Sequence, residues 1–286
     1  MRPILLISIL AWGGTSLCQA DVTIGSAVNY GILGMSTSTM VNNMGTVNGT
    51  VGISANGPYL SFNGKTVNGN VVNMNSGWFS NRGTIGGSMS TDAAGLYQSA
   101  TDAQNAFNTA LTLAPTQSLA RINTPSTING ADGLNVISVA GNITNSLNLN
   151  GSSNSFFVVL VGGTLALGAN ESLGVSGGLT ANHVLYVFDG PNGTVTTSAN
   201  DTVNGTLLAP AYNFTLNGTF NGAIIGGGQN ITVMNAVINS NPYGSLLPAV
   251  PATDPTGVPE PMTFLITGLG LIAVVGFARF SAKRTR

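Results

Sequence analysis

The chain has 286 residues and a formal net charge of −1, with 43% hydrophobic but only 6% charged residues. Five of its eight cations lie at the two ends of the chain, so residues 21–261 carry three cations and nine acids, a net charge of −6. Nucleic acid and anionic membrane surfaces require a dense set of Lys and Arg, so the composition excludes them as ligands of this segment. Frequent Val, Ile, Leu and Phe exclude a disordered chain.

The first twenty residues have the form of a secretory signal peptide. Arg2 precedes the apolar residues 4–12, and small residues then lead to Ala20. This pattern predicts export, with cleavage after Ala20. A lipoprotein site at Cys18 is the weaker alternative, because Leu17 is bulky for the position before a lipidated cysteine. Cys18 is the single cysteine of the chain, so the mature protein is expected to form no disulfide and no thiolate metal site.

Short β-prone segments separated by Asn-Gly pairs fill the region from residue 21 to residue 245. Such pairs occur at Asn48-Gly49, Asn68-Gly69, Asn204-Gly205 and Asn217-Gly218. Asn and Gly tolerate positive φ, so each pair can turn the chain, either in the hairpins of a β-sandwich or at the corners of a β-solenoid. The scarcity of charge favours the solenoid, since stacked coils align like residues. The spacing is irregular, so we predict an irregular right-handed β-solenoid, with the sandwich as the alternative.

One segment breaks the β pattern. Apolar residues recur at steps of three and four between residues 91 and 114, on one helical stripe. They are Leu96, Ala100, Ala103, Phe107, Ala110 or Leu111, and Ala114. Thr91 or Asp92 can cap the start of a helix and Pro115 can end it. The sequence therefore predicts one long helix over residues 91–114, packed lengthwise along the β body.

Two stretches resemble families of exported bacterial β-solenoids. Residues 27–34 and 46–53, followed by the Asp102-Ala103-Gln104-Asn105-Ala106 helix segment, resemble the opening of the bacterial ice-binding-protein-like family. Residues 184–188, 205–211 and 221–227 are more similar to the choice-of-anchor A domain. Together the resemblances cover about residues 25–240. They imply a solenoid with one helix beside it, frequently joined to a surface anchor.

The sequence offers no constellation of catalytic residues. His183 is the single histidine, no G-x-S-x-G motif surrounds a serine, and a zinc site lacks ligands. His183 lies in the apolar stretch 179–188, where we expect a structural histidine in a strand. Asp189 and Asp201 are the best carboxylate pair, but residues 189–193 indicate a turn first and a calcium site second. We therefore predict no enzyme activity, no catalytic residue, no cofactor and no metal site.

The C-terminal residues have the form of a sorting signal. A Pro-rich linker is expected at residues 246–257, followed by Val258, Pro259, Glu260 and Pro261. Residues 262–278 are apolar and just long enough to cross a membrane as a helix. The basic tail 279–286 would stay on the cytoplasmic side; its cations are Arg279, Lys283, Arg284 and Arg286.

This arrangement resembles the PEP-CTERM signal of Gram-negative bacteria. The resemblance implies that a membrane-embedded transpeptidase, an exosortase, cuts near Pro259-Glu260-Pro261 and passes the protein to the cell surface or extracellular matrix. An ordinary C-terminal membrane anchor is the alternative for the same residues.

Three functions compete for the mature domain. The sorting tail and the charge-poor β body favour a structural or adhesive protein of the cell surface, biofilm or exopolysaccharide matrix. Ice binding is the alternative, but the segments Val203-Asn204-Gly205-Thr206, Leu216-Asn217-Gly218-Thr219 and Ile231-Thr232-Val233-Met234 present no common pattern of hydroxyl groups. We therefore expect little inhibition of ice growth. A polysaccharide-active solenoid ranks third, because three cations are too few to line a groove for an acidic polymer.

Overall fold

The computed structural model describes residues 22–35, 40–53, 60–62, 65–74, 79–191, 193–228 and 230–244. All of them belong to the first of two compact units, Met1–Leu246, and the second unit is Leu247–Arg286. The predicted signal peptide, the linker and the sorting segment lie outside the described residues. Within those residues, no helix combines the length and the apolar character that crossing a membrane demands.

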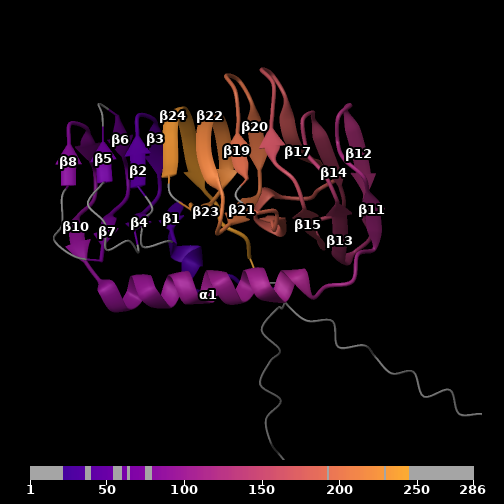
Figure 1. The fold of residues 1–286 in the computed structure, drawn as a ribbon, viewed down its shortest axis with the longest axis horizontal. Coiled ribbons are helices and arrows are strands. Elements are labelled where there is room, and N and C mark those ends of the chain that lie inside the picture. Colours follow the sequence, from indigo (N-terminus) through magenta and orange to yellow (C-terminus); the bar gives the residue numbers. More distant parts are fainter. Residues whose placement is uncertain are drawn as a thin grey trace, which may run out of the picture. The chain divides into compact units, whose positions relative to one another are not determined.

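The described residues form a stack of β coils with three sides, all paired in parallel (Figure 1). Side a is a single ten-stranded sheet. Its strands, in spatial order, are β10 (Met89–Thr91), β7 (Val71–Asn73), β4 (Val51–Ile53), β1 (Ile32–Gly34), β23 (Ile224–Gly226), β21 (Thr206–Ala209), β18 (Val184–Phe188), β15 (Ser155–Val161), β13 (Gly133–Val139) and β11 (Gln117–Leu119).

Sides b and c belong to one fourteen-stranded sheet, joined by two long strands that contribute to both. These strands are β22 (Asn213–Gly222) and β24 (Asn230–Ser240). Side b contains their C-terminal halves and β12 (Ser126–Asn129), β14 (Leu147–Asn150), β17 (Ser172–Ser176), β20 (Thr202–Asn204), β3 (Thr46–Asn48), β6 (Thr66–Val67) and β9 (Thr84–Ile85). Side c contains their N-terminal halves and β16 (Leu165–Ala166), β19 (Thr194–Thr196), β2 (Met40–Asn43), β5 (Leu60–Phe62) and β8 (Phe79–Asn81).

The order of the coils along the stack differs from their order in the chain. The N-terminal coils run outward from β1 to β10, and helix α1 (Ala93–Leu111) then leads to the far end, where β11 begins. The following coils run back until the last one meets the first. At this seam β1 pairs with β23, and β24 pairs with both β2 and β3.

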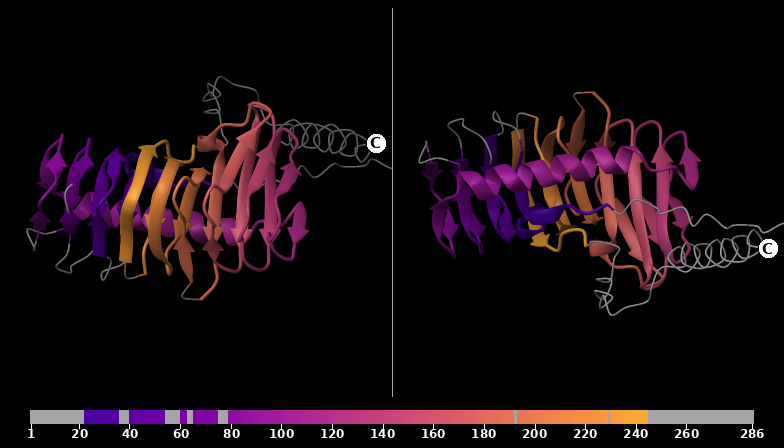
Figure 2. Two further views of the ribbon diagram at one scale, coloured as in Figure 1. Left: turned by 90° about the horizontal axis from the view of Figure 1, so that it is seen from above. Right: turned by 90° about the horizontal axis from the view of Figure 1, so that it is seen from below.

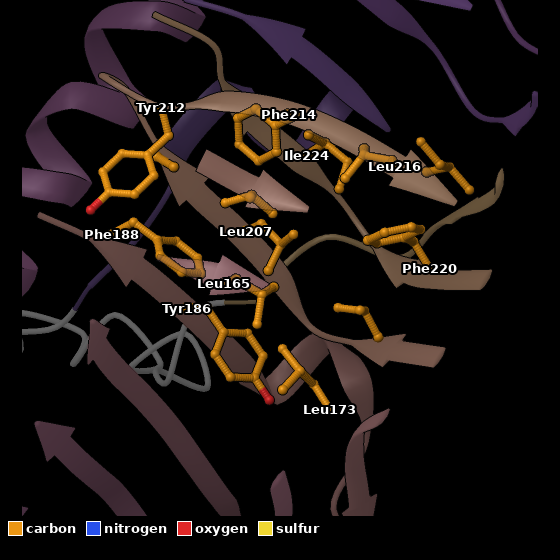
Figure 3. Close-up of a cluster of buried hydrophobic side chains, with 14 of the residues drawn as sticks. Leu165, Leu173, Tyr186, Phe188, Leu207, Tyr212, Phe214, Leu216, Phe220 and Ile224 are labelled. Atoms are coloured by element: carbon orange, nitrogen blue, oxygen red, sulfur yellow. The ribbon is translucent and has the colours of Figure 1, made fainter. Parts of the chain in front are cut away.

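Side a carries apolar residues on its outer surface, and α1 covers them (Figure 2). The helix buries Leu96, Ala103, Ala106 and Ala110 against outward residues of side a such as Leu208. The short 3-10 helix η1 (Gly25–Asn29) lies beside α1. The second cluster of buried side chains fills the interior of the stack; its aromatic members include Tyr186, Phe188, Phe214 and Phe220 (Figure 3).

Close stacking of the coils explains the glycine that follows the asparagine at the corner between sides b and a. A Cβ atom on Gly69 would lie 2.4 Å from backbone atoms of Gly49, and one on Gly222 would lie 2.0 Å from the carbonyl oxygen of Gly205. No side chain fits in that space. The Asn-Gly pairs at these corners therefore mark where successive coils touch, and the prediction of a solenoid is confirmed over a sandwich.

The helix is also confirmed, with narrower bounds. Asp92 caps its first turn by accepting a hydrogen bond of 2.9 Å from the backbone N–H of Gly95, and the helix ends at Leu111 before Pro115. Ala114 lies outside it and is exposed. The expected strand position of His183 is wrong: His183 ends the 3-10 helix η2 (Ala181–His183), before β18 begins.

Candidate functional site

The outward positions of side b form a regular row of β-branched residues. Thr202 pairs with Thr219, Thr219 with Val237 and Val237 with Thr46, and the row continues in the next two strands. The six members, which we call the threonine row, are Thr202, Thr219, Val237, Thr46, Thr66 and Thr84. Each is followed by a residue that points into the interior, as strand alternation requires. Five of six adjacent strands thus present a threonine at one position.

A second row lies two residues further along the same strands. Asn68 donates its side-chain N–H to Asn48 over 2.6 Å, and Asn48 donates to Asn239 over 2.8 Å. Asn239 donates in turn to Asn221 over 3.0 Å, and Asn221 to Asn204 over 2.9 Å. We call these five residues the asparagine ladder. Because each amide is fixed by its neighbour, the ladder holds the surface beside the threonine row in one arrangement.

Strand geometry sets the dimensions of this surface. Adjacent strands lie about 4.8 Å apart, so the six members of the threonine row span about 24 Å. Threonine and asparagine of one strand are two residues, or about 6.6 Å, apart. All members are partly or fully exposed, and none carries a charge. Side b therefore presents a two-dimensional lattice of hydroxyl, methyl and amide groups to solvent.

The expectation that the coils share no pattern of hydroxyl groups is wrong. The register aligns Thr219-Phe220-Asn221 with Thr202-Val203-Asn204, and the seam continues the same Thr-x-Asn pattern into Thr46-Val47-Asn48. The segments compared in the sequence occupy different sides, because Ile231 belongs to side c and Leu216 precedes a register shift in β22. The recurring Thr-x-Asn-Gly signature was the signal in the sequence that could have revealed the row.

Side c carries a second row of small residues, in which threonine recurs less regularly. Thr196 pairs with Thr215 and Ala166, and Thr215 pairs with Thr232. The register continues the row from Thr232 to Asn42, Ser61 and Ser80. Its neighbouring outward positions, Thr194 and Asn213, are mixed, and the described residues of side c form no ladder of asparagine side chains comparable to that of side b. The two sides share strand geometry, but threonine occupies five of six positions in the row on side b and three of seven in the row on side c.

The described residues contain no cluster of three or more His, Cys, Asp or Glu side chains that could hold a metal ion. The buried Asp201 accepts hydrogen bonds from the backbone N–H groups of Glu171 and Ser198, at 3.0 and 2.6 Å, so its carboxylate stabilises a corner. Asp189 is exposed. His183 stacks on Phe156, with ring centroids 4.0 Å apart. Burial in the apolar interior raises the pKa of Tyr186 well above its ordinary range.

Comparison with protein families identifies the fold independently. Residues 10–237 match the family described as the ice-binding-like adhesive domain. The chain belongs to this family. The match includes both the threonine row and the helix, since it spans nearly all of the described residues.

Solved ice-binding proteins have the same fold as this family member. An ice-binding protein of the Antarctic ascomycete Antarctomyces psychrotrophicus is 19% identical, with a TM-score of 0.55 over 78% of this chain and 99% of its own. The ice-binding protein of an Arctic yeast, with antifreeze activity, is 16% identical, with a TM-score of 0.57 over 77% and 94%. Ice-binding protein 1 of Shewanella frigidimarina is 19% identical, with a TM-score of 0.54 over 78% and 99%. Comparison with curated proteins finds no significant match.

Proposed function

We propose that the protein binds ice through side b, and that the threonine row with the asparagine ladder is the binding surface. The observation that carries the proposal is the regular presentation of the row across six adjacent strands, including the seam. Docking to a crystal surface sums many weak contacts, so the groups must already stand in a lattice before binding. The ladder supplies that order, and the ice-binding proteins of like fold support ice as the ligand.

Bulky substitutions on sides b and c, the two sides that α1 does not cover, test the proposal. Thr219→Tyr introduces a large ring in the middle of the threonine row, whereas Thr215→Tyr introduces the same ring on side c, in the same strand β22. We expect measurable thermal hysteresis from the unaltered protein, and loss of most of it in Thr219→Tyr alone. Loss in Thr215→Tyr alone would place the ice-binding surface on side c. Absence of hysteresis and of adsorption to ice in the unaltered, folded protein would rule out ice binding.

A second candidate is attachment to the cell surface or the extracellular matrix. It is favoured by the family description, which names an adhesive domain. In this function a non-enzymatic solenoid contacts exopolysaccharide through its uncharged sides. Deletion of the protein should weaken cell aggregation or biofilm cohesion, and Thr219→Tyr should leave cohesion unchanged if ice alone is the ligand of side b.

Export and sorting complete the proposal. The signal peptide ending at Ala20 and the PEP-CTERM-like residues 258–286 support delivery to the cell surface by an exosortase, with the choice-of-anchor A resemblance as additional support. Intact-mass measurement of the protein released from cells tests this route. A species that begins at Asp21 and ends near Pro261 is expected, and a species that retains residues 262–286 would indicate an ordinary membrane anchor.

A further inference from the structure

The stack of coils has two open ends. The described strands at one end are β8, β9 and β10, and those at the other end are β11 and β12, with Ile122 between them in an isolated bridge. Helix α1 stops short of both end coils in Figure 1, and among the described residues no further element lies over either edge. Strand edges of this kind leave backbone N–H and C=O groups free to pair with another chain.

The two ends have matching polarity. All strands of the stack are parallel, and each coil visits side a, then side c, then side b. The far end is therefore a continuation of the near end, as the seam already demonstrates within one chain: there a first coil pairs with a last coil through β1 and β23 and through β24 with β2 and β3. A second copy could stack in the same way, β11 on β10.

Side chains at the two ends are complementary in this arrangement. The register of side a places Met89 of β10 and Gln117 of β11 in one row, so stacking would cover Met89, which is 46% exposed. Asp92 is the first residue after β10 and Arg121 is the second after β11, so both lie at the same corner of the coil, one position apart in register. One copy's Arg121 would thus lie beside the next copy's Asp92.

No like charges meet across this contact. Arg82 would face the uncharged residues 123–125 of the second copy, and Asp132 would face the region of Ser88. Asp132 already accepts a hydrogen bond from Ser152 of its own chain. The contact would therefore cover one exposed apolar side chain, Met89, and add one favourable charge pair.

We propose that the two open ends form a head-to-tail self-association surface, on which a second copy of this chain continues the solenoid. Because the two surfaces differ, the contact does not close on itself and generates linear assemblies. An assembly of this kind would align the threonine rows of successive copies along one side. The proposal does not depend on which ligand side b binds.

Two variants, one for each end, test the proposal. Met89→Lys places a charge on the β10 edge, and Arg121→Glu places a like charge beside Asp92. In sedimentation velocity over a concentration series, we expect the unaltered protein to form oligomers. Each variant alone should shift the dissociation constant upward about tenfold or more. Mixing the two variants should restore association only as far as dimers, because Arg121→Glu retains an intact β10 end and Met89→Lys retains an intact β11 end.

The control is Lys65→Glu, which changes the charge as Arg121→Glu does but lies in the coil before the last. It should associate like the unaltered protein, and circular dichroism should show that all variants retain the β fold. A monomeric unaltered protein at every concentration overturns the proposal. Association that persists in both end variants also overturns it, because that association would come from another part of the chain, such as residues 245–286, which both variants retain. A mixture that yields no dimer overturns it as well.

Discussion

Sides a and b are both built from parallel strands in register, but α1 covers side a, whereas no described element covers side b. The outward row of side a contains Leu33, Ile225, Leu208 and Val187, one residue per coil, and it is buried beneath α1. The outward row of side b contains threonine at the corresponding interval, and no described element covers it. The backbone pairing between strands is of the same parallel kind on both sides. The chemistry of one residue per coil decides whether a side becomes core or a surface for a ligand.

The largest expected effect is on the packing of α1 against side a. Leu96 of α1 is fully buried against side a, whereas its neighbour Tyr97 is 67% exposed. Leu96→Ala leaves a cavity between helix and sheet and should lower the free energy of unfolding by about 2–5 kcal/mol. Tyr97→Ala, the matched control, should change it by no more than about 0.5 kcal/mol. Urea unfolding measures both, and equal effects would show that α1 is not part of the cooperative core.

The next effect tests whether side b is held by its asparagine ladder. Asn239 makes two ladder hydrogen bonds, to Asn221 and from Asn48, across the seam. Asn239→Ala removes both, and it should cost about 1–2 kcal/mol of stability. Asn68 ends the ladder with a single such bond, so Asn68→Ala should cost about half as much. If the two substitutions were equal in thermal unfolding, the ladder would contribute nothing beyond local contacts.

The sequence predicted those parts of this comparison that depend on local patterns. The helix was readable because Leu96, Ala103 and Ala110 share one stripe within a single segment. The coils were readable because Asn-Gly corners recur. The threonine row was not, because it joins Thr46 to Val237 across 190 residues and depends on the register at the seam. Asn217-Gly218 was also misleading, because it lies at the corner between sides c and b, where the register of β22 shifts and Gly218 has a φ of 86°, and not at the corner between sides b and a that the other Asn-Gly pairs occupy.

A smaller effect concerns the hydrogen bonds between η1 and α1. The hydroxyl and backbone N–H groups of Ser26 donate to Asp102 of α1 over 2.7 and 2.8 Å, and these bonds lower the pKa of Asp102. A carboxyl group whose pKa is lower in the folded state than in the unfolded state stabilises the fold at pH values above its unfolded-state pKa. That contribution disappears as the pH falls through the folded-state pKa. Thermal unfolding between neutral pH and about pH 3 should therefore show less loss for Asp102→Asn than for the unaltered protein. Identical pH profiles would contradict this role.

The smallest expected effect comes from completing the row of hydroxyl groups on side b. Val237 is the single member of the threonine row without a hydroxyl, and it is 37% exposed. Val237→Thr keeps the shape of the side chain and one methyl group, so stability should change by less than about 0.5 kcal/mol. If side b binds ice as a lattice, the added hydroxyl should lower the concentration needed for a given hysteresis by about twofold, which corresponds to about 0.4 kcal/mol. Thr219→Val, the reverse change in the neighbouring strand, should raise that concentration similarly. Opposite signs for the two substitutions would identify the hydroxyl groups as the contributing atoms, whereas unchanged activity in both would assign the contacts to the methyl groups that valine and threonine share.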